Sequence, residues 1–88
     1  MNIEYSPRYL FARKKFLRNS PQLLKKVIKT IRKFKKNPNH PSLNLEKLGV
    51  SKVWTLRIDK SNRIFFMWGN KLTAIFIDIG PHDKYRKY

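Results

Sequence analysis

The fold is decided by one segment, which reads Val53-Trp-Thr-Leu-Arg-Ile58-Asp-Lys-Ser-Asn-Arg63-Ile-Phe-Phe-Met-Trp68-Gly-Asn-Lys-Leu72-Thr-Ala-Ile-Phe-Ile-Asp-Ile79. Its β-branched and aromatic runs predict three strands, at 53–58, 63–68 and 72–79. The residues between these runs, Asp-Lys-Ser-Asn and Gly-Asn, are typical of turns. Because consecutive strands are joined by short connections, the segment predicts an antiparallel meander.

Upstream of the meander, the sequence predicts a short strand at 2–5 and then two helices. Ser6-Pro7 and Ser20-Pro21 each place an N-cap residue before a proline suited to the first helical position. The first helix is expected to run to about Arg18, and the second, which has apolar residues at helical spacing, to end at Asn37-Pro38. The tight break between them predicts an antiparallel helical hairpin.

The segment 37–50 is predicted to be a loop, which Leu43, Leu45 and Leu48 attach to the core. Together these elements predict one α+β domain over residues 1–88. In it, an N-terminal strand and a two-helix antiparallel hairpin pack on a twisted antiparallel sheet of about four strands.

The chain is strongly basic, with 21 Lys and Arg against 5 Asp and Glu among 88 residues, a formal net charge of +16. The net charge of +16 is far above the magnitude of about 2–8 that is enough to keep a small domain soluble. Nucleic acid is therefore the leading partner. An acidic protein or an anionic membrane surface is the competing interpretation, and a solvated lysine-rich exterior is the simplest one.

Several classes of site and location are disfavoured by composition. The chain has no cysteine, which excludes disulfides and thiolate metal sites and fits a cytoplasmic location. Two histidines without cysteine make a zinc site improbable, and no glycine-rich nucleotide loop is present. No stretch approaches the roughly 20 apolar residues that span a bilayer. We therefore expect no cofactor, no metal and no membrane partner.

Two arginines are expected to lie together on one side of the sheet. If the bulky apolar sets of the strands at 53–58 and 63–68 face the same core, alternation places Arg57 and Arg63 on the opposite side as direct or diagonal neighbours. Like charges so placed are normally destabilising, and a bound phosphate would remove the penalty. The alternative is two solvated arginines near a turn, with Asp59 neutralising one of them.

The C-terminal residues after the last strand carry the groups best suited to proton transfer. His82 can gain or lose a proton near neutral pH, as phosphodiester cleavage requires. Tyr85 could share such a site, and Asp83 could orient His82 or pair with Lys84. Alternatively, His82 is simple surface, and Tyr85 and Tyr88 cover the open end of the core or stack on bases. His40, in the loop, is interpreted as structural.

The chain resembles the RelE/ParE superfamily of bacterial toxins from toxin–antitoxin systems. The resemblance is carried, in family order and besides the basic hairpin, by Tyr5-Ser-Pro7, Asn37-Pro-Asn-His-Pro-Ser-Leu43, Glu46-Lys-Leu48, Trp54-Thr-Leu-Arg-Ile58, Asn62-Arg-Ile-Phe-Phe66 and Asp78-Ile-Gly-Pro-His-Asp-Lys-Tyr85. It covers nearly the whole chain. Thr55 stands where RelE has a strand lysine, and RelE has an arginine near the position of His82. The chain therefore departs from RelE and is more similar to members that end in His-Asp-x-Tyr.

The resemblance implies a RelE-like fold and a ribosome-dependent messenger-RNA endonuclease that a cognate antitoxin, acidic or amphipathic, holds inactive. It implies catalytic roles for Arg57, Arg63, His82 and Tyr85. The residues predicted to bind RNA phosphates are Lys47, Lys52, Lys84 and Arg86. Ribosome and messenger RNA are the implied partners.

Two other functions remain open on the same fold. The ParE branch of the superfamily inhibits DNA gyrase without cutting RNA. A nucleic-acid-binding module without activity would keep the basic surface alone.

Overall fold

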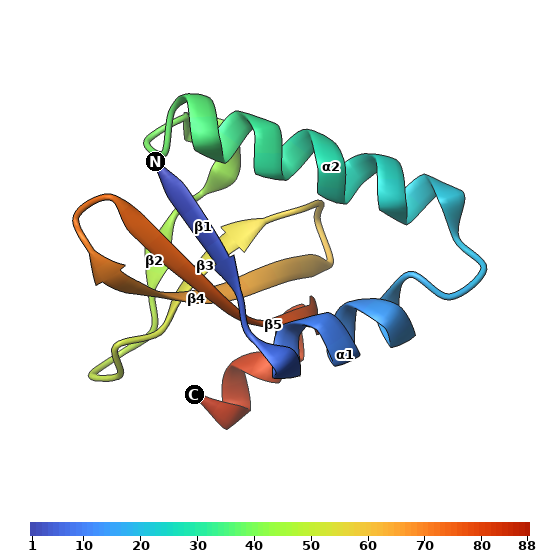
Figure 1. Cartoon of the computed structure of the whole chain (residues 1–88). Coiled ribbons are helices and arrows are strands. Elements are labelled where there is room, and N and C mark those ends of the chain that lie inside the picture. The colour runs from blue at the N-terminus through green and yellow to red at the C-terminus, as the bar shows by residue number, and fades with distance from the viewer.

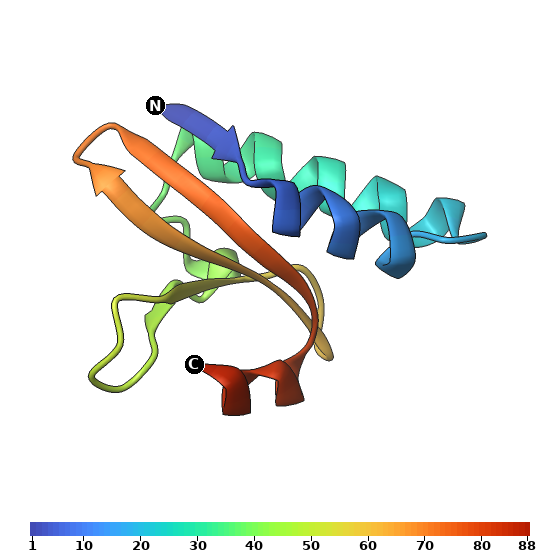
Figure 2. The ribbon, with the colours of Figure 1, turned by 60° about the horizontal axis from the view of Figure 1, so that its bottom comes forward.

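The computed structural model describes residues 1–88 and contains one five-stranded sheet with the strand order β1-β5-β4-β3-β2. The strands are β1 (Asn2–Tyr5), β2 (Glu46–Lys47), β3 (Trp54–Arg57), β4 (Asn62–Asn70) and β5 (Thr73–Pro81). The helices α1 (Pro7–Phe16) and α2 (Pro21–Lys36) lie over one face and run in opposite directions (Figure 1). The short 3₁₀ helix η2 (His82–Lys87) lies on the other side of the sheet (Figure 2).

The predicted α+β class, N-terminal strand, helical hairpin and β3-β4-β5 meander are confirmed, but the sheet differs from the prediction in two ways. It has five strands rather than about four, because β2, inside the predicted loop, pairs with β3 over two residues. It is also not purely antiparallel, since β1 pairs with β5 in parallel. The helical hairpin between β1 and the rest of the sheet supplies the long crossover that a parallel pair needs.

The two serine–proline signals start the helices as predicted. The Ser6 hydroxyl accepts a hydrogen bond from the backbone N–H of Tyr9 at 3.1 Å, and Ser20 does the same for Leu23 at 3.3 Å. Helix α1 ends at Phe16, earlier than predicted, and Asn19 then adopts a positive φ of 57°. Asparagine tolerates this left-handed conformation, which reverses the chain between the helices. None of the helices is long and apolar enough to cross a membrane.

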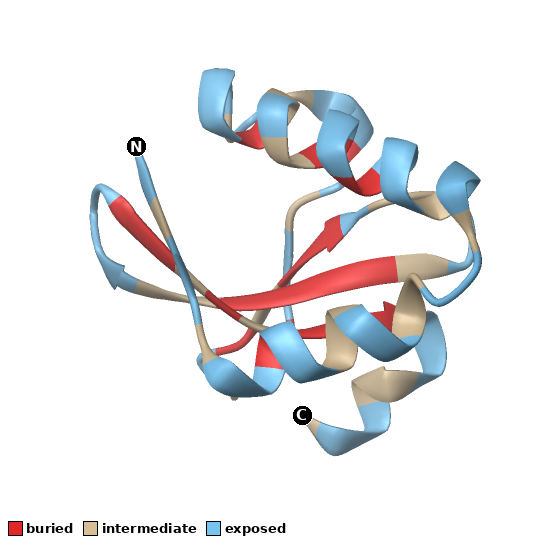
Figure 3. Cartoon of the chain, turned by 45° about the vertical axis from the view of Figure 1, so that its right-hand side comes forward, coloured by how far each residue is buried: buried red, intermediate tan, exposed pale blue.

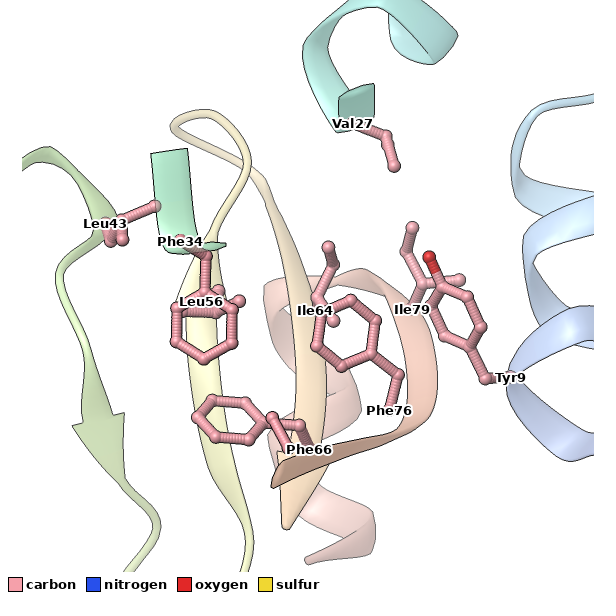
Figure 4. Packing of buried hydrophobic residues seen from close by; sticks show 10 residues of the cluster. Tyr9, Val27, Phe34, Leu43, Leu56, Ile64, Phe66, Phe76 and Ile79 are labelled. Atoms are coloured by element: carbon pink, nitrogen blue, oxygen red, sulfur yellow. The ribbon is translucent and has the colours of Figure 1, made fainter. Parts of the chain in front are cut away.

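The main core lies between the helices and the sheet, where the buried residues concentrate (Figure 3). Phe34 of α2, Phe66 of β4 and Phe76 of β5 converge there with ring centroids 5.2–6.3 Å apart (Figure 4). Each aromatic side chain buries a large apolar area, so this face supplies most of the hydrophobic stabilisation.

The loop before β3 is attached to both faces of the sheet. It contains the short 3₁₀ helix η1 (Pro41–Leu43), and Leu43 is buried in the main core, with Leu45 packed against it. Leu48 instead joins a small cluster with Val53 and Phe65 on the opposite face. The predicted role of these leucines is confirmed.

A bulge in β5 adds a buried carboxylate to the second face. Phe65 is paired with Asp78 but Phe66 with Phe76, so Ile77 is an extra residue in β5. A bulge of this kind places two successive residues opposite one and shifts the alternation. Ile77 consequently packs on the small cluster, and the Asp78 carboxylate also meets the C-terminal residues on this side.

Candidate phosphate-binding site

Arg57 and Arg63 are direct cross-strand partners in the β3–β4 pair, as the alternation predicted. Their neighbours Leu56 and Ile64 are in the main core, so the arginines lie on the other face. Arg57 is exposed, and Arg63 is only 7 % exposed. Because β2 pairs only with Trp54 and Thr55, Arg57 stands at an open edge of β3. At this edge Arg57 also borders a cleft of about 210 Å³ on the helix-covered side, together with lysines of α2.

The Arg63 guanidinium is buried without a carboxylate. Its Nη1 donates to the carbonyl oxygens of Asp59 at 2.7 Å and Asn62 at 2.9 Å, while its Nε is buried and has no partner. No ion pair involves either Arg57 or Arg63. A buried, uncompensated positive charge is costly, so this site is electrostatically prepared for an anion.

Asp59 does not neutralise an arginine, contrary to the alternative considered from the sequence. Its carboxylate accepts hydrogen bonds from the backbone of Ser61 and from Asn62, closing the β3–β4 turn, and it pairs with Lys26 at 3.2 Å. Burial opposes ionisation of this carboxyl, but these hydrogen bonds outweigh burial and hold the pKa of Asp59 below its usual value.

The structure brings His82 to the β3–β4 turn and stacks Tyr85 on His82. The backbone N–H of His82 donates to the Ser61 carbonyl at 2.8 Å, and its imidazole stacks on the Tyr85 ring with centroids 4.1 Å apart. The Tyr85 hydroxyl lies 3.1 Å from the Thr55 hydroxyl, and Thr55 is two residues from Arg57 on β3. The His82 side chain is exposed, so it is open to exchange a proton with a ligand.

Tyr85 and Tyr88 also cover the sheet, which was one of the alternatives for these residues. The Phe65 ring meets the Tyr85 ring edge-on at 5.7 Å and the Tyr88 ring at 5.3 Å. Tyr85 therefore has two contacts with different consequences, one that closes the small cluster and one that supports the imidazole of His82.

Lys84 is partly buried and folds back onto Asp78 rather than extending into solvent. Its Nζ lies 2.9 Å from the Asp78 carboxylate and 3.2 Å from the Ile79 carbonyl. Asp83, which was expected to orient His82 or pair with Lys84, does neither. Burial would raise the pKa of Asp78, but hydrogen bonds from Lys84, Tyr88 and the Ile79 N–H outweigh it and lower that pKa.

The other predicted RNA-binding cations lie at the periphery. Lys52 and Arg86 are exposed, and Lys47 is exposed with its Nζ 3.3 Å from the Gly49 carbonyl. Lys47 borders an open cleft of about 470 Å³ beside Tyr85 and Tyr88. These positions permit contacts to a long polyanion but do not converge on Arg63.

Glu46 is a residue of this cleft that sequence reasoning missed. It lines the cleft together with Tyr85, and its strand partner is Thr55, whose hydroxyl meets Tyr85. A carboxylate there can accept a proton. Only the register of the two-residue strand β2 reveals this placement.

His40 is structural, as predicted. Its Nδ1 accepts a hydrogen bond from the backbone N–H of Ser42 at 3.1 Å, which starts η1. No group of three or more histidine, aspartate or glutamate side chains comes together in a way that could hold a metal ion.

The fold is similar to several solved toxin structures. One is a YoeB/ParE toxin from Agrobacterium tumefaciens, with a TM-score of 0.74, 19 % identity, and coverage of 93 % of this chain and 99 % of that one. The fold is that of the RelE/ParE toxins. YafQ from E. coli superposes with a TM-score of 0.75 at 14 % identity, over 94 % of each chain.

A third similar structure is a heterotetrameric complex of the YoeB–YefM toxin–antitoxin from Staphylococcus aureus. It has a TM-score of 0.72 and 20 % identity, over 93 % of this chain and 97 % of that one. No protein-family model matches the chain, and no curated protein is similar to it in sequence. The likeness therefore concerns the fold, and the activity has to be argued from the site.

Proposed function

We propose that this protein is the toxin of a type II toxin–antitoxin system and acts as an endoribonuclease on messenger RNA in the ribosome. The observation that carries the proposal is the buried Arg63 guanidinium, which has no carboxylate partner, faces Arg57 and lies at the turn that His82 contacts. The shared fold with the YoeB and YafQ toxins supports the same conclusion.

The proposed reaction is transesterification within the RNA. The 2′-oxygen attacks the adjacent phosphorus while its proton passes to a base, and the 5′-oxygen leaves as it gains a proton from an acid. The new bond gives a 2′,3′-cyclic phosphate and a free 5′-hydroxyl. Because the nucleophile is part of the RNA, the mechanism does not require a metal.

Within this mechanism, Arg57 and Arg63 bind the phosphate and stabilise the negative charge that builds at phosphorus. His82 is one proton carrier, the acid or the base. Tyr85 supports its ring, and either Tyr85 or Glu46 is a candidate for the second proton carrier. Lys47, Lys52 and Arg86 extend the electrostatic attraction to flanking phosphates, which predicts binding that weakens steeply with salt.

The proposal is tested by inducing the wild type, His82→Ala and Arg63→Ala in cells and mapping messenger-RNA ends. Arg18→Ala is a matched control, since it removes an exposed arginine between the two helices. We expect growth arrest and new RNA ends with the wild type and the control, and neither with the two site variants. Variants as toxic as the wild type would refute the assignment.

A gyrase inhibitor on the same fold is the second candidate, because one similar structure is described as a YoeB/ParE toxin. It predicts loss of DNA supercoiling with intact RNA, so a gyrase assay beside a translation assay separates the two. Tight, salt-sensitive RNA binding without growth arrest would instead indicate a binding module without activity.

The proposed antitoxin is an acidic or amphipathic polypeptide. The net charge of +16 favours rapid association with such a partner, and the YoeB of S. aureus is seen in complex with YefM. Co-purification of the chain with products of the neighbouring reading frame should recover a small acidic protein. Recovery of nucleic acid alone would count against this partner.

A further inference from the structure

We propose that Asp78 is a positioning residue that holds η2 against the sheet and thereby fixes the rings of His82 and Tyr85 next to the β3–β4 turn to which Arg63 is hydrogen-bonded. Its effect on catalysis rests on the proposed endoribonuclease activity, whereas the positioning itself does not. Asp78 belongs to β5 and touches neither His82 nor Tyr85, so it acts through other residues of η2.

The Asp78 carboxylate is the buried anchor of the C-terminal residues. It is 1 % exposed, and its two oxygens accept from different groups. Oδ1 accepts from Lys84 at 2.9 Å and from the backbone N–H of Ile79 at 2.8 Å, while Oδ2 accepts from the Tyr88 hydroxyl at 2.8 Å. Charge-assisted hydrogen bonds of this kind are the strong ones.

Lys84 and Tyr88, the two residues that Asp78 holds, flank Tyr85 in the sequence. Lys84 precedes Tyr85 and Tyr88 follows it, so both ends of this turn are tied to one carboxylate. The Tyr85 hydroxyl then meets Thr55, and His82 stacks on the Tyr85 ring. The main chain of His82 is held by its own hydrogen bond to the Ser61 carbonyl, and the plane of its imidazole is set by the Tyr85 ring, whose position depends on the contacts of Asp78.

Apolar burial alone does not hold this turn. No residue of η2 is fully buried, and only Tyr85 and Tyr88 pack on the small cluster below. A six-residue 3₁₀ helix has weak hydrogen-bond geometry of its own. The polar anchor, together with the hydrogen bond from the His82 N–H to the Ser61 carbonyl, gives the turn one orientation.

The bulge at Ile77 places the anchor on this side of the sheet. Without the extra residue, strict alternation would place Asp78 on the helix-covered side, since Phe76 faces that core. The bulge turns the carboxylate toward η2. Arg8 of α1, 3.7 Å from Oδ2 and mostly exposed, is a weaker contact that links the anchor to the first helix.

Asp78→Asn is the sharpest variant, because an amide nitrogen cannot accept a hydrogen bond and one side of the anchor must be lost. Asp83→Asn is the matched control, since it makes the same charge change on η2 itself at a residue without a side-chain partner. Tyr88→Phe removes a single hydroxyl and serves if Asp78→Asn does not fold.

The experiment measures the His82 ring protons by NMR together with the kinetics of RNA cleavage. In the wild type, the Tyr85 ring at 4.1 Å should move these proton resonances upfield. In Asp78→Asn and Tyr88→Phe we expect the upfield shift to be reduced. For Asp78→Asn, kcat should fall on the order of 100-fold, as for small misplacements of a reacting group, with KM little changed. Asp83→Asn should match the wild type in both.

Each outcome is decisive. Unchanged His82 shifts in folded Asp78→Asn would overturn the positioning role. Altered shifts with unchanged kcat would overturn only its importance for catalysis. A wild-type protein that cuts no RNA refutes the proposed function, and the NMR comparison still tests the anchor.

Discussion

The two faces of the sheet are built differently. The face under α1 and α2 carries a cluster of ten buried residues, all of them apolar or aromatic. The face under η2 carries a cluster of three, Leu48, Val53 and Phe65, next to the buried polar residues Thr55, Arg63 and Asp78. The thick apolar face stabilises the fold, whereas the thin polar face contains the buried guanidinium of Arg63, which has no carboxylate partner, contributes little stability and suits an anionic ligand.

The largest expected effect is on stability, and the adjacent residues Phe65 and Phe66 of β4 compare the two faces. Phe66→Ala opens the main core and should lower the free energy of unfolding by about 3–5 kcal/mol. Phe65→Ala should lower the free energy of unfolding less, by about 3 kcal/mol or below, because the short 3₁₀ helix η2 that covers Phe65 can move into the space. Chemical denaturation of the two variants measures the comparison. A greater loss from Phe65→Ala would contradict it.

Arg63→Met should separate activity from stability. Loss of the guanidinium is expected to reduce RNA cleavage about 10²–10³-fold, as for other groups that stabilise developing charge. The free energy of unfolding should change little, because loss of the hydrogen bonds to the Asp59 and Asn62 carbonyls is offset by removal of a buried charge that has no carboxylate partner. Cleavage kinetics and denaturation of one preparation test both parts. A strongly destabilised variant would show that Arg63 is needed for folding.

Tyrosine titration of the wild type and of Asp78→Asn should distinguish the two faces at high pH. Burial raises the pKa of Tyr9, in the main core, to about 12, and burial together with the hydrogen bond to Asp78 raises that of Tyr88 to about 12. Since these folded-state pKa values lie above the usual 10, the stability they contribute is complete below pH 10 and is lost as pH rises through about 12.

Ultraviolet absorbance of the wild type should show two of the four tyrosines ionising near pH 12. In Asp78→Asn, the Tyr88 pKa should fall toward its usual value while that of Tyr9 is unchanged. Equal shifts of both tyrosines would indicate a change of the whole fold instead of the anchor.

Removal of a helix cap should have the smallest effect, a loss of stability confined to the apolar face of the sheet. Ser6→Ala and Ser20→Ala each remove a side-chain acceptor from a helix start and should cost about 1 kcal/mol. Activity of the folded variants should be unchanged, because both helices lie across the sheet from His82. A Ser20→Ala variant that is folded but inactive would contradict this separation.

Most of the apolar architecture could be predicted from the sequence because it depends on local periodicity and caps. The paired arginines also followed from alternation. The strand β2 could not be predicted, because two residues are too few to show an alternating pattern. Without β2, the position of Glu46 opposite Thr55 could not be predicted either. The role of Asp78 depends on the bulge, whose only sequence signal is that Phe76 and Ile79 are three residues apart and yet face one core.

The most direct test of the account is whether an RNA phosphate contacts the two arginines of the thin face. A messenger-RNA fragment with a 2′-deoxy nucleotide at the cleavage position cannot be cut and is titrated into protein labelled at arginine side chains. The account predicts saturable, salt-sensitive shifts of the Arg57 and Arg63 Nε–H resonances. Shifts confined to the arginines of the helices, with Arg57 and Arg63 unchanged, would contradict it.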